Sequence, residues 1–236
     1  MDAVAATPDV TSRIGANLVS INERISAAAS RAGRGQDEIT IVAVSKTVDR
    51  ATIDAAYDAG LRVFGENRVQ DAIAKLQPAL PADASMHLIG QLQSNKARPA
   101  VQHFDLIESV DRPSLVTALD AASRAREHTT PVLLQVNVAG ESQKAGCLPS
   151  DSAALVELIR AAPFLDLMGL MTIAPLVDDS EAVRPVFRGL HQLRAQLRLQ
   201  FPDLALPVLS MGMSNDFEVA VEEGATHVRI GRALFA

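Results

Sequence analysis

The sequence predicts a (β/α)8 TIM barrel: a ring of eight parallel strands covered by helices, with an extra helix before the first strand. Eight short apolar runs alternate with eight segments of helical periodicity across the 236 residues. Strict alternation of this kind is typical of a parallel sheet covered by helices, and eight repeats fit a closed barrel. The alternative is an open doubly wound sheet. It is disfavoured because no G-x-G-x-x-G motif follows any of the runs.

The strands are predicted from runs that are rich in Val, Ile and Leu and too short for buried helices. The first run, Ile-Thr-Ile-Val-Ala-Val-Ser-Lys, ends abruptly in a lysine. Each later run begins or ends near a glycine, a proline or a polar residue, which is typical of strand boundaries. The expected strands cover residues 39–46, 61–64, 86–89, 106–110, 132–138, 167–173, 207–211 and 227–230.

The helices are predicted from apolar residues that recur at steps of three and four. In the first helix Ile14, Leu18, Ile21 and Ile25 share one face, and Gly33 follows its end. We count this leading helix as the one that closes the ring. The expected helices cover residues 10–32, 50–59 and 69–76, a segment ending near 103, a segment after 111, and residues 151–161, 180–200 and 215–223.

Composition narrows the classes of function. The net charge of −6 argues against a nucleic-acid partner, because phosphate contacts need clustered Lys and Arg. The single cysteine, Cys147, excludes an intramolecular disulfide and a cysteine-rich zinc site, and we expect no bound metal. No targeting segment is recognisable, and no apolar run approaches the roughly 20 residues that span a bilayer. We therefore expect one cytoplasmic domain, residues 1–236, monomeric and without a membrane partner.

Lys46 is the first candidate functional residue, because it ends a buried strand. Parallel α/β folds place their chemistry at the carboxyl ends of the strands. An amine held there against apolar surroundings has its charged form disfavoured, so its nucleophilic form is more available for a Schiff base with a carbonyl compound. The alternative is an ordinary solvent-facing lysine.

The last two strands end in a pattern that suits a phosphate group. Barrels commonly bind phosphate at the loops after strands seven and eight, through free N–H groups. Glycine lets the backbone approach such a ligand closely. A second interpretation, compatible with the first, is that Ser214 or Asn215 caps the following helix. The candidate residues here are Ser210, Gly212, Met213, Ser214 and Gly231.

A lysine that traps aldehydes and a phosphate cradle at one rim indicate a ligand that carries both groups. Pyridoxal 5′-phosphate (PLP) is the leading candidate. A sugar phosphate, processed by a lysine-dependent aldolase mechanism, is the competing one.

The sequence also resembles the pyridoxal phosphate homeostasis protein family, whose barrel is similar to the amino-terminal domain of bacterial alanine racemase. The resemblance implies that Lys46 forms the Schiff base, that Ser214, Gly231 and neighbouring backbone hold the phosphate, that Asn67 lies near the cofactor ring, and that Arg229 faces the pyridine nitrogen. The matching motifs are Ala43-Val44-Ser45-Lys46-Thr47, Phe64-Gly65-Glu66-Asn67, His87-Leu88-Ile89-Gly90, Leu92-Gln93-Ser94-Asn95-Lys96, Gly169-Leu170-Met171, Leu209-Ser210-Met211-Gly212-Met213-Ser214 and Val228-Arg229-Ile230-Gly231.

Arg229 also bears on whether the chain is an enzyme. An arginine cannot give up its proton, so it would keep the facing ring nitrogen unprotonated and the ring a poorer electron sink. The only tyrosine, Tyr57, falls in a helix of the outer ring, where we expect it to pack rather than to act as a second acid or base. We therefore predict no catalytic residue and a protein that holds and supplies PLP in vitamin B6 homeostasis.

Two other functions stay open on the sequence. One is a PLP-dependent amino-acid racemase of low rate. The other is an interaction protein in which bound PLP signals to a partner, with PLP-dependent apoenzymes as the expected partners. We assign no role to Lys96, Lys144 or Cys147.

Overall fold

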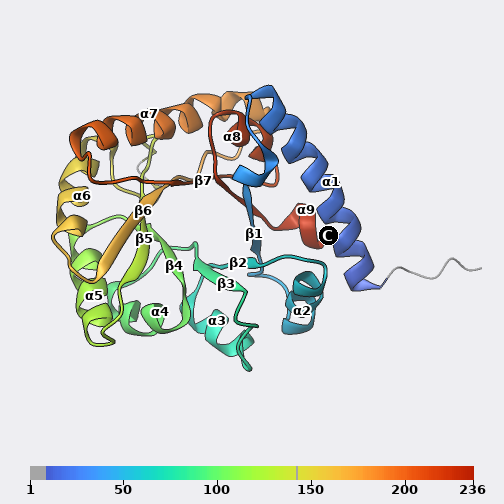
Figure 1. Ribbon diagram of the computed structural model, residues 1–236, viewed down its shortest axis with the longest axis horizontal. Coiled ribbons are helices and arrows are strands. Elements are labelled where there is room, and N and C mark those ends of the chain that lie inside the picture. Colours follow the sequence, from blue (N-terminus) through green and yellow to red (C-terminus); the bar gives the residue numbers. More distant parts are fainter. Residues whose placement is uncertain (1–8, 142) are drawn as a thin grey trace, which may run out of the picture.

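The computed structural model of the chain describes residues 9–141 and 143–236. Residues 1–8 and 142 of the expected domain lie outside the described residues. In the described part, eight parallel strands form a closed ring in sequence order, with β8 hydrogen-bonded to β1. Figure 1 shows this ring with the helices arranged around it. The predicted TIM barrel, including the helix before its first strand, is confirmed.

Each predicted strand has a counterpart whose ends differ from the prediction by a few residues at most. The most important difference lies in the first strand, which ends at Val44, so that Ser45 and Lys46 belong to the turn after it. The strands are β1 (Thr40–Val44), β2 (Val63–Glu66), β3 (Ser85–Leu88), β4 (Leu106–Val110), β5 (Thr130–Gln135), β6 (Leu165–Met171), β7 (Val208–Met213) and β8 (His227–Ile230).

The helices also follow the prediction, with two differences. The expected helix 180–200 starts with a 3-10 turn, Ser180–Val183, and becomes α-helical at Arg184, where Pro185 suits the first turn because it lacks an N–H. A short helix after β8, α9, was not expected. The α-helices are α1 (Val10–Arg31), α2 (Arg50–Asp58), α3 (Val69–Lys75), α4 (Ala97–His103), α5 (Pro113–Arg124), α6 (Ser152–Arg160), α7 (Arg184–Gln200), α8 (Phe217–Glu222) and α9 (Arg232–Phe235).

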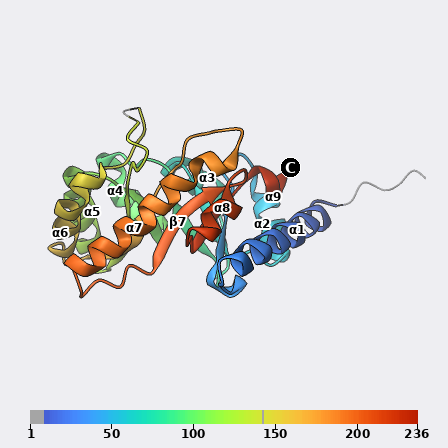
Figure 2. The same ribbon diagram turned by 90° about the horizontal axis from the view of Figure 1, so that it is seen from above.

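Helix α1 covers the seam at which the ring closes. It packs against α2, α8 and α9, and Figures 1 and 2 both show it beside α9 although the two helices stand at opposite ends of the chain. The Asn17 amide donates hydrogen bonds to the carbonyl oxygens of Leu234 (3.0 Å) and Ala236 (3.2 Å). Within the described ranges, none of the helices combines the length and apolar character needed to cross a membrane.

The strands separate two packing regions. Along β8, Val228 and Ile230 belong to the large core between strands and helices. Because side chains alternate across a strand, His227 and Arg229 point to the other side, into the barrel. The barrel interior also holds a small apolar cluster that includes Leu106, Leu133, Met171 and Val208. This interior therefore combines an apolar layer with buried charge.

Ion pairs join α1, α8 and α7 on the outer surface. Arg184 donates to Glu222 (2.6 Å) and Glu223 (3.0 Å), Arg188 pairs with Glu223 (2.8 Å), and Arg31 pairs with Glu222 (2.6 Å). Hydrogen bonds from Arg188 and Arg184 lower the pKa of Glu223. Burial alone would raise the pKa of Glu222, but the bonds from Arg184 and Arg31 outweigh it and lower that pKa too.

We predict that Arg184→Gln lowers the free energy of unfolding by about 1 kcal/mol at pH 7, the scale of a partly exposed ion-pair network. Because the folded-state pKa values of both glutamates are depressed, their contribution is present above the unfolded pKa of about 4.3 and is lost as pH falls through the folded values. Urea unfolding at several pH values should therefore show that the variant loses less stability in acid than the wild type.

Arg198→Gln is the matched control for this prediction, because Arg198 is exposed on the same helix. It should leave both the stability and its acid dependence close to those of the wild type. An Arg184→Gln curve that parallels the wild type down to pH 3 would contradict the prediction.

Candidate functional site

Lys46 lies at the carboxyl-terminal rim of the barrel, as predicted, but not in apolar surroundings. The last ladder contact of its segment is the bond from the Ser45 N–H to the Gly65 carbonyl oxygen (3.0 Å). Lys46 comes after that contact, in the turn, and its side chain is exposed. The expectation of an amine held against apolar surroundings is therefore wrong, because β1 ends before its packing can enclose the lysine.

The residue before the lysine is held by a buried ion pair. The Ser45 hydroxyl donates to Glu66 Oε1 (2.7 Å), and Lys75 Nζ donates both to Glu66 Oε1 (2.8 Å) and to the Ser45 carbonyl oxygen (2.8 Å). Glu66 is 1% exposed, and its pairing with Lys75 supplies the counter-charge that a buried carboxylate requires. Together with the Ser45 N–H bond to β2, these contacts fix the backbone from which Lys46 projects.

Asn67 follows β2 at the same rim and is half-buried. The chain after β3 passes directly over its backbone, and a Cβ at Gly90 would lie 2.2 Å from the Asn67 carbonyl oxygen. Glycine is therefore required at position 90 for this close approach. This close contact holds the backbone of Asn67 just beyond the end of β2, the strand next to β1.

The loops after β7 and β8 touch each other. Ser214 lies between β7 and α8, and its hydroxyl accepts a long hydrogen bond (3.4 Å) from the N–H of Ala233 in α9. The residue that precedes α8 is Asp216, whose carboxylate accepts from the Met213 N–H (2.6 Å). The expected capping of this helix by Ser214 or Asn215 is therefore wrong, and the Ser214 hydroxyl instead joins the two loops that were predicted to hold a phosphate.

Positions 212 and 231 are both glycine, but for different structural reasons. Gly212 has φ +91°, and a Cβ there would lie 2.5 Å from the Ala220 Cβ, so the close packing of α8 on β7 requires glycine. Gly231 differs, because a Cβ there would meet only Val44, at an ordinary 3.4 Å. The chain's own packing does not demand glycine at 231, whereas a group bound against this backbone would.

Arg229 is buried inside the barrel, with 4% of its surface exposed. Its guanidinium donates to the Ser210 hydroxyl (2.7 Å) and to the Thr172 carbonyl oxygen (2.8 Å). Burial lowers the pKa of this arginine, while the negative charge of Glu108 opposes that shift. Ser210 in turn donates to Glu108 Oε2 (2.5 Å), so its hydroxyl faces Arg229 in the barrel interior rather than the loop of Ser214.

Glu108 and His87 are the residues that sequence reasoning missed. Glu108 is fully buried in β4, and its other oxygen, Oε1, lies 2.8 Å from His87 Nδ1 on β3. Burial would raise the pKa of Glu108, but the hydrogen bond and charge of His87 and the charge of Arg229 outweigh it and lower the pKa. The signal was a carboxylate in the middle of the apolar run Leu106–Val110, where an unpaired charge is not tolerated.

The closure of the ring brings these parts together. In the pairing of β1 with β8, Ala43 lies opposite Ile230 and Val42 opposite Arg229. Lys46 and Gly231 therefore leave neighbouring strands, about 4.8 Å apart, at the same rim. The turn that carries Lys46 and the loop that begins at Gly231 therefore lie at one rim of the barrel, and Arg229 lies on the interior side of the strand that leads to Gly231.

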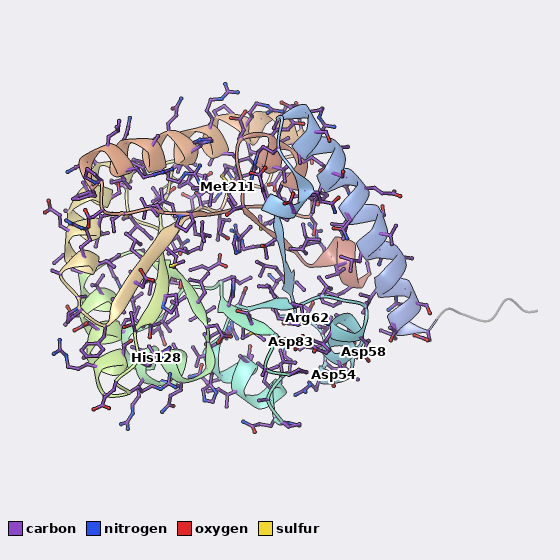
Figure 3. The ribbon with its side chains drawn as sticks, in the orientation of Figure 1. Asp54, Asp58, Arg62, Asp83, His128 and Met211 are labelled. Atoms are coloured by element: carbon purple, nitrogen blue, oxygen red, sulfur yellow. The ribbon has the colours of Figure 1, made fainter. Side chains whose placement is uncertain are left out.

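Tyr57 lies outside this arrangement, as predicted. Its hydroxyl donates to Asp83 (2.5 Å), and the Arg62 guanidinium stacks over its ring, 4.1 Å from the centroid. Figure 3 shows Arg62 and Asp83 near Asp54 and Asp58 of α2 and away from Met211 of β7. Tyr57 is therefore a packing residue of the outer ring.

Comparisons with known proteins agree with this geometry. The family model described as alanine racemase, N-terminal domain, matches residues 16–236. A pyridoxal phosphate homeostasis protein of Aquifex aeolicus is 43% identical over 218 residues, which cover 92% of this chain and 95% of that protein. The solved structure of PipY of Synechococcus elongatus with PLP bound is 39% identical, with a TM-score of 0.83, over 94% of this chain and all of that one.

The fold and the rim thus define a barrel of the alanine racemase N-terminal-domain type. An alanine racemase of Clostridium difficile shares this fold alone, at 12% identity and a TM-score of 0.74, and the match covers 56% of the racemase chain. Within this class of barrels, the coverage and sequence identity of the match to the Aquifex aeolicus protein decide the family. The chain belongs to the pyridoxal phosphate homeostasis protein family.

We predict that Lys75→Met lowers the free energy of unfolding by about 3 kcal/mol, because it leaves the Glu66 carboxylate buried without its counter-charge. Urea unfolding monitored by circular dichroism measures this loss.

The double variant Lys75→Met, Glu66→Met is the control, since it removes both charges. It should recover a large part of the lost stability. A double variant that is less stable than Lys75→Met would show that the pair does not act as a unit.

Proposed function

We propose that this protein binds pyridoxal 5′-phosphate at the rim formed by β1, β7 and β8 and holds it covalently on Lys46. The single observation that carries the proposal is the pairing of β1 with β8, because the turn that carries Lys46 and the loop that begins at Gly231 follow these two adjacent strands. The 39% identical PipY structure, described as having PLP bound, supports the choice of ligand. In our assignment, Ser214 and the backbone at Gly212, Met213 and Gly231 hold the phosphate.

The chemistry that the cofactor supplies is its aldehyde. The Lys46 amine in its neutral form would add to the aldehyde carbon. The two protons of the amine and the oxygen of the aldehyde would leave as water, and a C=N bond would link the lysine to the cofactor. No oxidant or reductant is needed. The exposure of Lys46 suits this role, because the amine is accessible both to the incoming aldehyde and to a second amine that could take the aldehyde over.

The other side chains in our assignment bind and orient. Asn67 lies beside the ring, and Arg229 directs its guanidinium at the ring nitrogen. Ser210, which the sequence assigned to cofactor binding, supports Arg229 through the 2.7 Å bond between them. Arginine stays protonated and cannot donate its proton to the ring nitrogen, so the site stabilises bound cofactor more than it assists removal of a Cα proton.

We further propose that the role of this site is to hold and hand over PLP rather than to turn over amino acids. Tyr57 supports this, because its contacts with Asp83 and Arg62 fix it on the outer side of the barrel, where it cannot face Lys46. The recipients in this proposal are PLP-dependent apoenzymes, and the protein acts as a monomer of one domain.

We expect borohydride treatment of the PLP-loaded protein to fix one reduced cofactor on the peptide that contains Lys46. Lys46→Ala should lose the visible absorption of the bound aldehyde and the modified peptide, because no other amine lies at that position. Absorption spectra and peptide mass analysis provide the measurement. Lys96→Ala is the matched control and should keep both signals; full colour in Lys46→Ala would refute the assignment.

We also expect no exchange of the Cα hydrogen of alanine or serine with deuterium over hours in D2O with the loaded protein. The physical reason is the absence of a second acid or base from our assignment of the rim. Proton NMR of the amino acid measures the exchange. Exchange that depends on Lys46 would favour a slow racemase instead.

A further inference from the structure

The barrel interior contains a chain of hydrogen bonds of which the proposed function uses only the link between Ser210 and Arg229. Glu108 on β4 is linked to Ser210 on β7 (2.5 Å), and Ser210 is linked to Arg229 on β8 (2.7 Å). Strands β4 and β7 are not neighbours in the ring, so the first of these bonds crosses the interior. We call these three residues the interior relay.

The direction of each bond in the interior relay is fixed by chemistry. A guanidinium has only donors, so the Ser210 oxygen must accept from Arg229. A serine hydroxyl has a single proton, and that proton then goes to Glu108 Oε2. This order requires Glu108 to be an acceptor at Oε2, as an ionised carboxylate is. The contact between Glu108 Oε1 and His87 Nδ1 (2.8 Å) occupies the other oxygen.

Glu108 is also the negative charge that acts on Arg229 through this relay. The arginine is 4% exposed and Glu108 is fully buried, so water screens neither charge. The other titratable groups near Arg229 are less suited to supply this negative charge. Asp216 uses its carboxylate on the Met213 N–H (2.6 Å), and burial lowers the pKa of His227 to about 4, so that this imidazole is neutral.

Arg229 is held from two sides. The Thr172 carbonyl oxygen accepts from Nη2 (2.8 Å) and the Ser210 hydroxyl accepts from Nη1 (2.7 Å), which fixes the plane of the guanidinium. The Thr172 contact is to backbone and survives most substitutions. The Ser210 contact depends on a hydroxyl whose orientation Glu108 sets.

We propose that Glu108 is a positioning residue for the cofactor: through Ser210 it aims the Arg229 guanidinium at the pyridine nitrogen and keeps that nitrogen unprotonated. The inference rests on the proposed function, because it concerns the same site. It adds a residue of a non-adjacent strand, whose carboxylate is hydrogen-bonded to Ser210 and lies against His87.

The test uses the full chain loaded with PLP labelled with 15N in its ring. The ring-nitrogen chemical shift, followed across pH, reports protonation of that nitrogen, which a merely structural role would not change. Glu108→Gln, close in shape, and Ser210→Ala should each move the signal towards the protonated form and weaken PLP binding about tenfold, the effect of about 1.4 kcal/mol. The double variant should move it no further than either single one, because both act through one chain of bonds.

Ser109→Ala is the matched control. It removes a fully buried hydroxyl from the strand of Glu108, and in the described chain that hydroxyl has no hydrogen-bond partner. It should leave the ring-nitrogen signal and PLP affinity unchanged. Glu108→Asp should restore part of the wild-type signal. If Glu108→Gln fails to fold, the result for Ser210→Ala decides whether the proposal stands. That variant keeps the charges of Glu108 and Arg229 and removes only the hydroxyl that links them.

Two negative results are distinguishable. Borohydride trapping on Lys46 in both the wild type and Ser210→Ala, with an identical ring-nitrogen signal, would overturn the role of Glu108 and leave the proposed function standing. A wild type that is not trapped on Lys46 would overturn the proposed function, and with it the inference that rests on it.

Discussion

The hydrogen-bonded pairing of β1 with β8 is the contact on which the site depends. It closes the ring, and its register puts Val42 beside Arg229 and Ala43 beside Ile230. An amine near the start of the chain and a loop near its end thereby share one rim. A shift of one residue in this register would turn Arg229 towards the helices and away from Ser210 and Glu108. The same strand pairing therefore closes the barrel and fixes the relative positions of the site residues.

Charge inside the barrel is the second feature that shapes the molecule. Most barrel interiors of this type are filled with branched apolar side chains. Here an apolar layer that includes Leu133 and Val208 lies beside Glu108 and Arg229, which are both almost completely buried. Such charges are tolerated only when they are paired and hydrogen-bonded. In this barrel, a hydrogen-bonded guanidinium and its carboxylate partner thus occupy interior space that apolar side chains usually fill.

The sequence was sufficient for the fold and for the residues that stand at strand ends. Apolar period and strict alternation predicted all eight strands, position alone singled out Lys46, and Arg229 was recognised from the resemblance to a known family. It was not sufficient for contacts across the barrel. Glu108 and Ser210 are 102 residues apart, and no local pattern pairs them. The sequence also left open whether Lys46 is enclosed or faces solvent, because one or two residues at a strand end decide this.

The position of α1 has a consequence for how the chain folds during synthesis. Asn17 contacts Leu234, which follows it by 217 positions, and α8 and α9 also pack on α1, so a large part of the apolar face of α1 stays uncovered until these last helices have been synthesised. Ile14, Ile21 and Ile25 form that face. Until α8 and α9 have been made, the uncovered part of this face is exposed apolar surface of the kind that chaperones bind, and products truncated before α8 would keep it exposed.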